Sequence, residues 1–306
     1  MAEAIYGSDA SIMNKSEIYK IFNQQMAMDY SCSPEDVCDF DNHIFTLRRG
    51  GSFCNLVQNG CYDKQVQGGS CGKTAQNRCC GEEEQKGKCV KPGQRRLKPE
   101  DYLAKVISLN GKYIIVADER IVDALRACAG IPGEWISMAQ FTDPINEITS
   151  RYGYVLRDQH HFYLPTGVNG ISADEISKMK EEYTLKWYER DELEKFRGDE
   201  RFTSALSFVD TAPDMIGLAA WKDGKILGMS GVSADSDTMW QIGINVMKEG
   251  RGRNLGAFLT ILMKEEVMRR GKLPFYGTAE SHIQSQKVAI KSGFIPTWYE
   301  AYWYRK

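Results

Sequence analysis

The chain has 306 residues, with 42% hydrophobic and 26% charged residues and a formal net charge of −2. These values are typical of a soluble globular protein. The near-neutral charge argues against binding to nucleic acid or to an anionic membrane through a general basic field. No apolar run reaches about 18 residues, so no membrane span is expected. The first twenty residues lack the charged and apolar regions of a signal peptide, and we expect a cytoplasmic protein.

The N-terminal half is predicted to mix helices and strands. Apolar residues at helical spacing predict a helix over 15–28, and "HIFTL" predicts a short strand. Two apolar runs flank Asn110 and Gly111, the favoured pair of a type I′ hairpin. Asp143 and Pro144 predict the N-cap and the first residue of a further helix. "YVLRDQHHFYLP" predicts the strand that closes this half.

A cysteine-rich insert of about residues 50–94 interrupts this pattern. Its cysteines are Cys54, Cys61, Cys71, Cys79, Cys80 and Cys89. The insert has no C-x-x-C pair and no histidine, which weakens a zinc site. Six cysteines in a polar stretch too small for its own core resemble a three-disulfide module. A reducing cytosol would instead keep them as thiols, so disulfides, metal binding and free thiols all stay open.

We predict a domain boundary near residues 167–170, which gives an N-terminal domain of 1–168 and a C-terminal domain of 169–306. Ser172 and Glu175 have the spacing of a capping box at the start of a helix. A strand, two short helices, a hairpin turning at Asp223 and Gly224, and further alternating strands and helices follow. This order predicts a mixed sheet with helices on its faces. The predicted fold class is therefore α+β, with a smaller α+β domain and the insert preceding the C-terminal sheet.

The stretch "EGRGRNLG" joins a predicted strand to an amphipathic helix. Gly252 allows the backbone to adopt positive φ, and the free amides and dipole of the helix N-terminus favour an anion. Arg251 and Arg253 add positive charge. The alternative is a solvated basic turn. A nucleotide P-loop and a dinucleotide fold are both disfavoured, because neither GK[ST] nor G-x-G-x-x-G is present.

Two further features connect this loop to a known family. "RGRNLG" has the layout Arg/Gln-x-x-Gly-x-Gly/Ala, with Asn254 in place of the middle glycine, and a strand and a helix ending in "KSGF" follow. Residues 172–306 thus resemble the GNAT superfamily of N-acyltransferases. The resemblance implies that the loop binds the pyrophosphate of acetyl-CoA and that the acyl-pantetheine lies between two splayed strands. The implied cofactor-binding residues are Ile244, Asn245, Val246, Arg251, Gly252, Arg253, Asn254, Gly256, Ala257, Ser281, Ser285 and Gln286.

The catalytic residues are harder to assign. Many family members carry a tyrosine four residues before the glycine of "GF" as the proton donor, and Ala289 stands there. Tyr276, His282 and Ser285 are the alternative candidates by their nearness to the strand end, and Glu280 could act as a base through a water. Each also has a structural explanation, as a packed ring, a surface residue or a dipole-compensating carboxylate.

Other aromatic and histidine residues have less certain roles. Five aromatic residues could line an acceptor pocket, although aromatic residues on strands more often fill a core; they are Trp187, Tyr188, Trp221, Trp240 and Trp298. His160 and His161 have no partner at metal-ligand spacing and are interpreted as structural, and no metal site is predicted.

The function implied by the resemblance is transfer of an acetyl group from acetyl-CoA to an amine. We expect a small-molecule or peptide acceptor, because the charge pattern shows no long charged groove. The alternative is a non-catalytic acyl-CoA sensor or scaffold whose cysteine-rich module binds a partner. A zinc-dependent nucleic-acid binder is disfavoured by the charge and by the absent C-x-x-C pairs.

Overall fold

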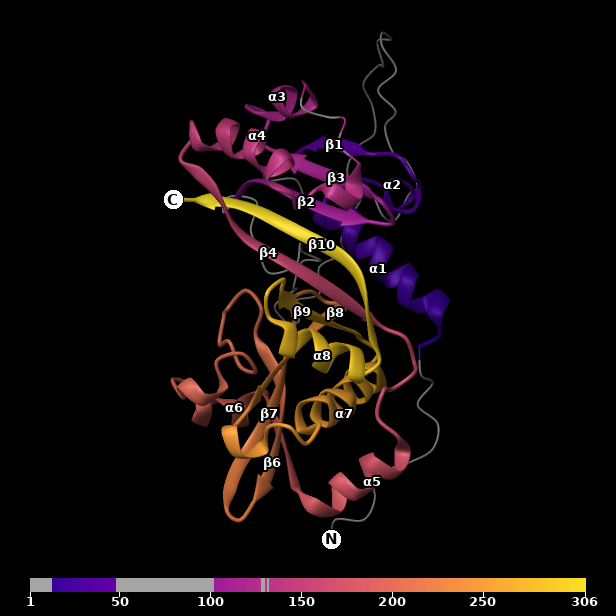
Figure 1. Cartoon of the computed structure of the whole chain (residues 1–306), viewed down its shortest axis with the longest axis vertical. Coiled ribbons are helices and arrows are strands. Elements are labelled where there is room, and N and C mark those ends of the chain that lie inside the picture. Colours follow the sequence, from indigo (N-terminus) through magenta and orange to yellow (C-terminus); the bar gives the residue numbers. More distant parts are fainter. Residues whose placement is uncertain (1–12, 48–101, 128–129, 131) are drawn as a thin grey trace, which may run out of the picture.

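The computed structural model describes residues 13–47, 102–127, 130 and 132–306. Its strands form a ten-stranded mixed sheet in the order β1-β3-β2-β10-β4-β9-β8-β7-β6-β5 (Figure 1). The strands are β1 (His43–Thr46), β2 (Tyr102–Leu109), β3 (Lys112–Ala117), β4 (Tyr154–Pro165), β5 (Thr184–Glu189), β6 (Asp214–Lys222), β7 (Lys225–Ser233), β8 (Met239–Val246), β9 (Leu273–Ala279) and β10 (Phe294–Arg305). The predicted α+β class is confirmed.

Helices cover both faces of the sheet. They are α1 (Lys15–Asp29), α2 (Pro34–Cys38), α3 (Val122–Ala127), α4 (Ala139–Ser150), α5 (Ala173–Glu182), α6 (Arg190–Leu193), α7 (Leu255–Arg269) and α8 (Ile283–Lys291), with 3₁₀ turns at Gly133–Trp135, Glu194–Phe196, Glu200–Phe202 and Lys248–Gly250. Side chains alternate between the faces along each strand. On β9, Tyr276 packs with α7, whereas Phe275 packs with α1. We call these two sides of the sheet the α7 face and the α1 face.

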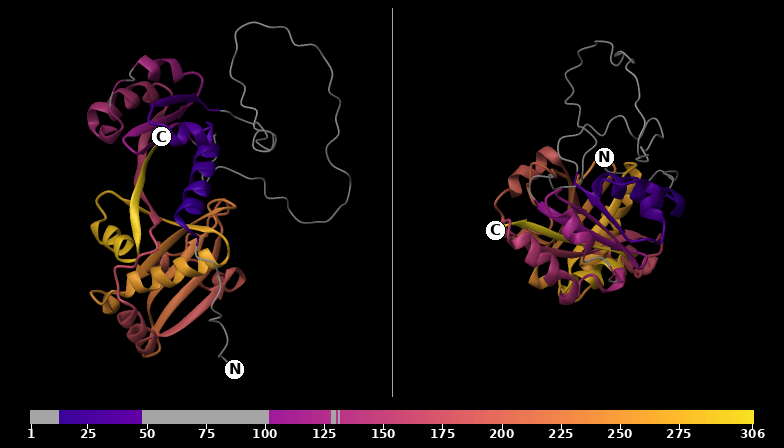
Figure 2. Two further views of the ribbon diagram at one scale, coloured as in Figure 1. Left: turned by 90° about the vertical axis from the view of Figure 1, so that its right-hand side faces the viewer. Right: turned by 90° about the horizontal axis from the view of Figure 1, so that it is seen from above.

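The strands β4 and β10 connect the two ends of the sheet (Figure 2). β10 pairs antiparallel with β4 along its length and with β2 on its other edge. β4 also pairs with β9, from His160 opposite Ala279 to Tyr163 opposite Tyr276. The strand that closes the predicted N-terminal domain therefore lies between two strands of the predicted C-terminal domain. The boundary near residue 168 stays a prediction, and the sheet is continuous across it.

Most of the predicted local signals match the observed elements, but the helix start predicted at Asp143 and Pro144 is wrong. The hairpins turn at Asn110-Gly111 and Asp223-Gly224, with positive φ at all four residues. Pro144 lies inside α4, which begins five residues earlier, at Ala139, with Met138 as its N-cap. Phe141 and Ile145 are both buried in the core beneath α4, so packing extends the helix upstream of the proline. Pro144 lies beyond the first four helical residues, so α4 lacks the hydrogen bond to the carbonyl of Gln140 that an N–H at this position would donate.

The cysteine-rich insert of residues 50–94 lies outside the described residues, as do the predictions made for it. Cys32 and Cys38 are free cysteines among the residues that the structure describes. In the same part of the chain, no helix is both long and apolar enough to cross a membrane.

Candidate functional site

The two parallel strands β8 and β9 separate part-way along their length. They pair from Met239 opposite Leu273 to Ile242 opposite Tyr276. Beyond that point β8 continues to Val246 with β7 as its partner, and β9 continues to Ala279 with β4 as its partner. The gap between residues 243–246 and 277–279 is the space in which the family resemblance would place an acyl-pantetheine. Ile244, Asn245 and Val246 form its β8 wall.

The loop after β8 and the start of α7 present a row of free backbone donors. Asn254 accepts the first helical hydrogen bond, from the N–H of Phe258. The six N–H groups of residues 252–257 donate to no acceptor in the part of the chain that the structure describes. Gly252 and Asn254 both have positive φ, which turns the chain sharply into the helix. Successive free amides at a helix N-terminus form an anion cradle.

Two neighbouring helices fix the position of this cradle. The side-chain amide of Asn254 donates to Oε1 of Glu175 at 2.7 Å and accepts from Nζ of Lys291 at 2.7 Å. Ser172 caps α5 through the N–H of Glu175, but the Glu175 carboxylate binds Asn254 rather than closing the predicted capping box. The residue that replaces the middle glycine of the motif therefore joins α5, α7 and the end of α8.

Gly256, in the first turn of α7, allows a close approach of helix and strand. A Cβ atom there would lie 3.3 Å from side-chain atoms of both Val246 and Val288. Glycine therefore lets α7 pack tightly against β8 and α8. Ala257, next to it, is buried.

The arginines of the loop are exposed. Arg251 donates from Nε to the carbonyl of Val246. This hydrogen bond folds the Arg251 side chain back toward the end of β8. Arg253 lies 3.7 Å from Glu182, whose carboxylate is also 2.8 Å from Nζ of Lys222. These neighbours hold the pKa of Glu182 below its usual value, chiefly through the hydrogen bond from Lys222. The positive charge at the cradle is therefore only partly neutralised.

Tyr276 lies beneath α8 at the base of the gap. Its hydroxyl is 2.9 Å from that of Ser285, and its ring is 2% exposed. Burial raises the pKa of Tyr276 to about 12. Ala289, which stands at the family's tyrosine position, is buried in the same apolar cluster. The phenol thus enters this region from the sheet, whereas the family pattern supplies it from the helix.

The turn between β9 and α8 carries the other predicted residues. Glu280 lies 3.1 Å from Nε2 of His161, a contact that the sequence did not indicate. Ser281 and His282 are exposed, and among the described residues no side chain, that of His282 included, caps α8. Gln286 donates to the carbonyl of Glu280 at 2.7 Å, so its side chain holds the turn.

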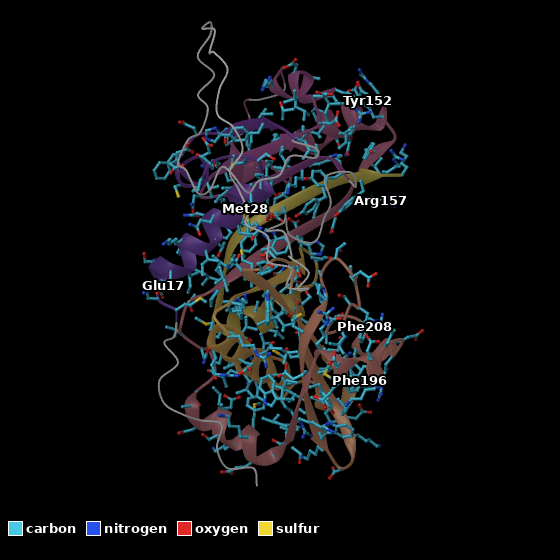
Figure 3. The ribbon with its side chains drawn as sticks, turned by 180° about the vertical axis from the view of Figure 1, so that it is seen from behind. Glu17, Met28, Tyr152, Arg157, Phe196 and Phe208 are labelled. Atoms are coloured by element: carbon cyan, nitrogen blue, oxygen red, sulfur yellow. The ribbon has the colours of Figure 1, made fainter. Side chains whose placement is uncertain are left out.

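Asn245 has a clear structural role on the α1 face. Its Oδ1 accepts hydrogen bonds from the N–H groups of Ser204 and Ala205, at 2.9 and 2.7 Å. The chain there lies so close to the sheet that a Cβ on Gly243 would be 2.0 Å from the carbonyl oxygen of Ser204. In Figure 3, Glu17 and Met28 mark α1, and Phe196 and Phe208 mark the segment that includes these residues. The side chain of Asn245 therefore anchors this segment.

The aromatic residues considered for an acceptor pocket mostly fill the core. Tyr188, Trp240 and Trp298 are 1%, 7% and 3% exposed, and each belongs to an apolar cluster. Trp187 on the edge strand β5 is 37% exposed. The core interpretation thus holds for the three buried rings.

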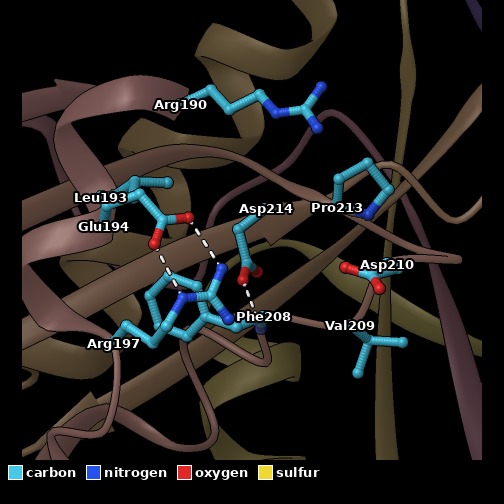
Figure 4. Close-up of a pocket in the computed structure, with 9 residues that line it drawn as sticks. All are labelled: Arg190, Leu193, Glu194, Arg197, Phe208, Val209, Asp210, Pro213 and Asp214. Atoms are coloured by element: carbon cyan, nitrogen blue, oxygen red, sulfur yellow. Dashed lines mark hydrogen bonds and ion pairs between the residues drawn. The ribbon is translucent and has the colours of Figure 1, made fainter.

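Two further features lie away from the cradle. Asp36, Asp39 and His43 are close enough to share a cation, but the ammonium group of Lys112 donates to Asp39 at 2.6 Å and takes that place. Figure 4 shows a pocket between α6 and the start of β6. Its Arg197 is paired with both carboxylate oxygens of Glu194. The pocket lies at the opposite end of the strands from the cradle, because Asp214 is at the β6 end that pairs with Ser233.

The chain is similar in structure to solved GNAT-family proteins. A GCN5-related N-acetyltransferase-like protein from Streptococcus suis matches with a TM-score of 0.41 and 16% identity, over 68% of this chain and 86% of that one. GCN5-related N-acetyltransferases from Sphaerobacter thermophilus and Kribbella flavida match with TM-scores of 0.38 and 0.36, each at 14% identity. They cover 54% and 52% of this chain and 56% and 62% of their own. No family model and no curated protein matches the chain.

Several residues that shape the site were not identified from the sequence. Glu175 and Lys291 hold Asn254, and Glu182 pairs with Arg253. These contacts join residues far apart in the chain, so spacing could not reveal them. On β4, Nδ1 of His160 lies 2.5 Å from Oδ1 of Asp158. Their i, i+2 spacing on a predicted strand was the one available signal, because it places both side chains on the same face.

Proposed function

We propose that this protein transfers an acyl group from acyl-CoA, with acetyl-CoA as the expected donor, to the amine of a small molecule. The observation that carries the proposal is the row of six unpaired N–H groups from residue 252 to 257, next to the gap between β8 and β9. A pyrophosphate supplies the acceptors that these donors lack, and the gap beside it suits an extended thiol-bearing chain. The resemblance of the motif to the GNAT pattern supports the same ligand.

The residues around the cradle would place the cofactor in a defined direction. Arg251 and Arg253 would contribute charge-assisted hydrogen bonds to the phosphates. Asn254, Glu175 and Lys291 would hold the loop in place before the ligand arrives, because they are already hydrogen-bonded to one another. A preformed cradle lowers the ordering cost of binding. The thiol end would then lie along β8 toward Ile242.

Tyr276 and Ser285 are suited to protonate the departing thiolate. A phenol whose pKa is about 12 stays protonated at neutral pH, so it can donate a proton but cannot serve as a base. Its hydroxyl is 2.9 Å from Ser285. In this proposal Ser285 donates to the sulfur and recovers its proton from Tyr276. Backbone N–H groups of residues 244–246 would stabilise the oxyanion of the tetrahedral intermediate.

The cradle is tested by calorimetric titration of the full chain with CoA. The double variant Arg251→Gln/Arg253→Gln is expected to weaken binding roughly 10- to 100-fold, since two hydrogen bonds are lost and a typical one contributes about 0.5–1.5 kcal/mol net. Lys248→Gln is the matched control, because Lys248 is an exposed basic residue just before the cradle. It should bind CoA as the wild type does. A wild-type chain that does not bind CoA would refute the proposal.

Turnover separates this enzyme from an acyl-CoA sensor. Release of free thiol from acetyl-CoA in the presence of small primary amines supports transfer. Tight CoA binding with no thiol release from any amine in the panel would instead support the sensor.

A further inference from the structure

The histidines His160 and His161 are adjacent on β4 and point to opposite faces of the sheet. His161 lies on the α7 face, where its Nε2 is 3.1 Å from Glu280 and its ring centroid is 5.6 Å from that of Tyr299. His160 lies on the α1 face, two residues before Phe162, which packs in the cluster beneath α1. The ring centroids of His160 and Phe162 are 6.0 Å apart, as expected for side chains on one face.

The carboxylate of Asp158 contacts Nδ1 of the His160 ring. Nδ1 lies 2.5 Å from Oδ1 of Asp158, and the two side chains are 33% and 38% exposed. A carboxylate at Nδ1 selects the tautomer in which Nε2 has the free lone pair. The opposite residue on β10 is Glu300, which is fully buried and accepts hydrogen bonds from Trp298 and Tyr302. His160 therefore offers an oriented and solvent-accessible proton acceptor.

The α1 face of the gap between β8 and β9 is covered along part of its length. On the α7 face, the Tyr276–Ser285 pair and the packing of Val288 on Gly256 close it. On the α1 face, the backbone of Ser204 covers Gly243, and the side chains of Phe162 and Gln241 cover Gly277, whereas Ala279 at the end of β9 is partly exposed. An acceptor molecule would therefore approach an acyl group from the α1 face at the Ala279 end of the gap.

His160 lies within one strand of that gap. It is directly opposite Ala279 in the β4–β9 pairing, and Ala279 belongs to the wall of the gap. Neighbouring strands are about 4.8 Å apart, so an imidazole on β4 has to reach past one strand only. The methyl group of Ala279 leaves this path open, and a single water could complete it.

We propose that His160, oriented by Asp158, is the general base that deprotonates the acceptor amine. The proposal rests on the acyl transfer proposed above. Nε2 takes a proton from the amine, and the nitrogen lone pair forms the new C–N bond with the acyl carbon. The C–S bond breaks, its electron pair stays on the sulfur of CoA, and the sulfur takes a proton from Ser285. Solvent then removes the proton from His160 and restores the one that Tyr276 and Ser285 have given up.

The test compares His160→Gln with His161→Gln in the full chain. The two histidines are adjacent, and each is paired with a carboxylate, so His161→Gln is a matched control on the opposite face. Thiol release from acetyl-CoA is measured with a panel of small primary amines and with water alone, and CoA affinity is measured by calorimetry. His160→Gln should lower thiol release by about 100-fold, the ordinary size of a general-base contribution, with CoA affinity unchanged. His161→Gln should leave both quantities near wild type.

Chemical rescue distinguishes a base from a structural residue. Added imidazole should raise the rate of His160→Gly and leave the wild type unaffected. Thiol release by His160→Gln at the wild-type rate, or equal losses in both histidine variants, would overturn the assignment while acyl transfer itself stands. If the wild-type chain binds no CoA, or binds it without thiol release, both the proposed acyl transfer and the role of His160 as its base are refuted.

Discussion

Lys264, in the middle of α7, is a buried cation whose effect on stability can be predicted in detail. It is 4% exposed, and its Nζ donates to Asn169 at 2.7 Å and to the carbonyl of Ser292 at 2.6 Å. No carboxylate is paired with it among the described residues. Burial lowers the pKa of Lys264 from 10.5 to about 8, since removal from water disfavours the charged form.

The direction of the pH effect follows from the two pKa values. Between about pH 8 and 10.5 the unfolded chain binds more protons at this lysine than the folded chain does. The free energy of unfolding therefore rises with pH over this window, and the penalty for the buried charge is fully present below it. At 1.36 kcal/mol per pKa unit, the expected gain between pH 7 and 9.5 is about 2 kcal/mol.

Urea unfolding at pH 7 and pH 9.5, followed by circular dichroism, measures this gain. Other groups titrate in the same range, so the informative quantity is the difference between proteins. The free energy of unfolding of wild type should gain about 2 kcal/mol more than that of Lys264→Met between the two pH values. Lys287→Met, which removes an exposed lysine from α8, should show the wild-type gain. Equal pH dependence in wild type and Lys264→Met would refute the argument.

Two further predictions concern the gap. Gly243→Ala should destabilise the protein by about 1–3 kcal/mol in urea unfolding, because its Cβ would meet the carbonyl oxygen of Ser204, a backbone atom, at 2.0 Å. In the control Gly252→Ala the new Cβ would meet nothing within 4 Å, so only the strain of the positive φ should lower the stability. An equal loss of stability in both variants would contradict the steric argument. Tyr276→Phe should slow thiol release from acetyl-CoA about 10²-fold or more with CoA affinity unchanged, since it removes only the hydroxyl that contacts Ser285. Thiol release at the wild-type rate would exclude Tyr276 as the proton source.

The local elements and the anion cradle follow from the sequence. Asn-Gly and Asp-Gly pairs determine the two hairpins because each turn needs positive φ at two residues, and both turns have it. "RGRNLG" between an apolar strand and an amphipathic helix indicates the free amides of residues 252–257, since a helix start always leaves its first N–H groups unpaired. The motif also includes Gly256, but the reason for a glycine there, the close approach of Val246 and Val288, is visible only in the structure.

What the sequence left open depends on long-range pairing. Spacing could not show that β4 would lie between β9 and β10, because strand order is determined by how the whole sheet buries its faces. That order alone brings Glu280 to His161 and places His160 beside Ala279. Tertiary packing also explains the wrong prediction at Pro144, where burial of Phe141 outweighs the preference of proline for a helix start. The cradle could be predicted from adjacent residues, whereas the groups that would move protons come together only when distant strands pair.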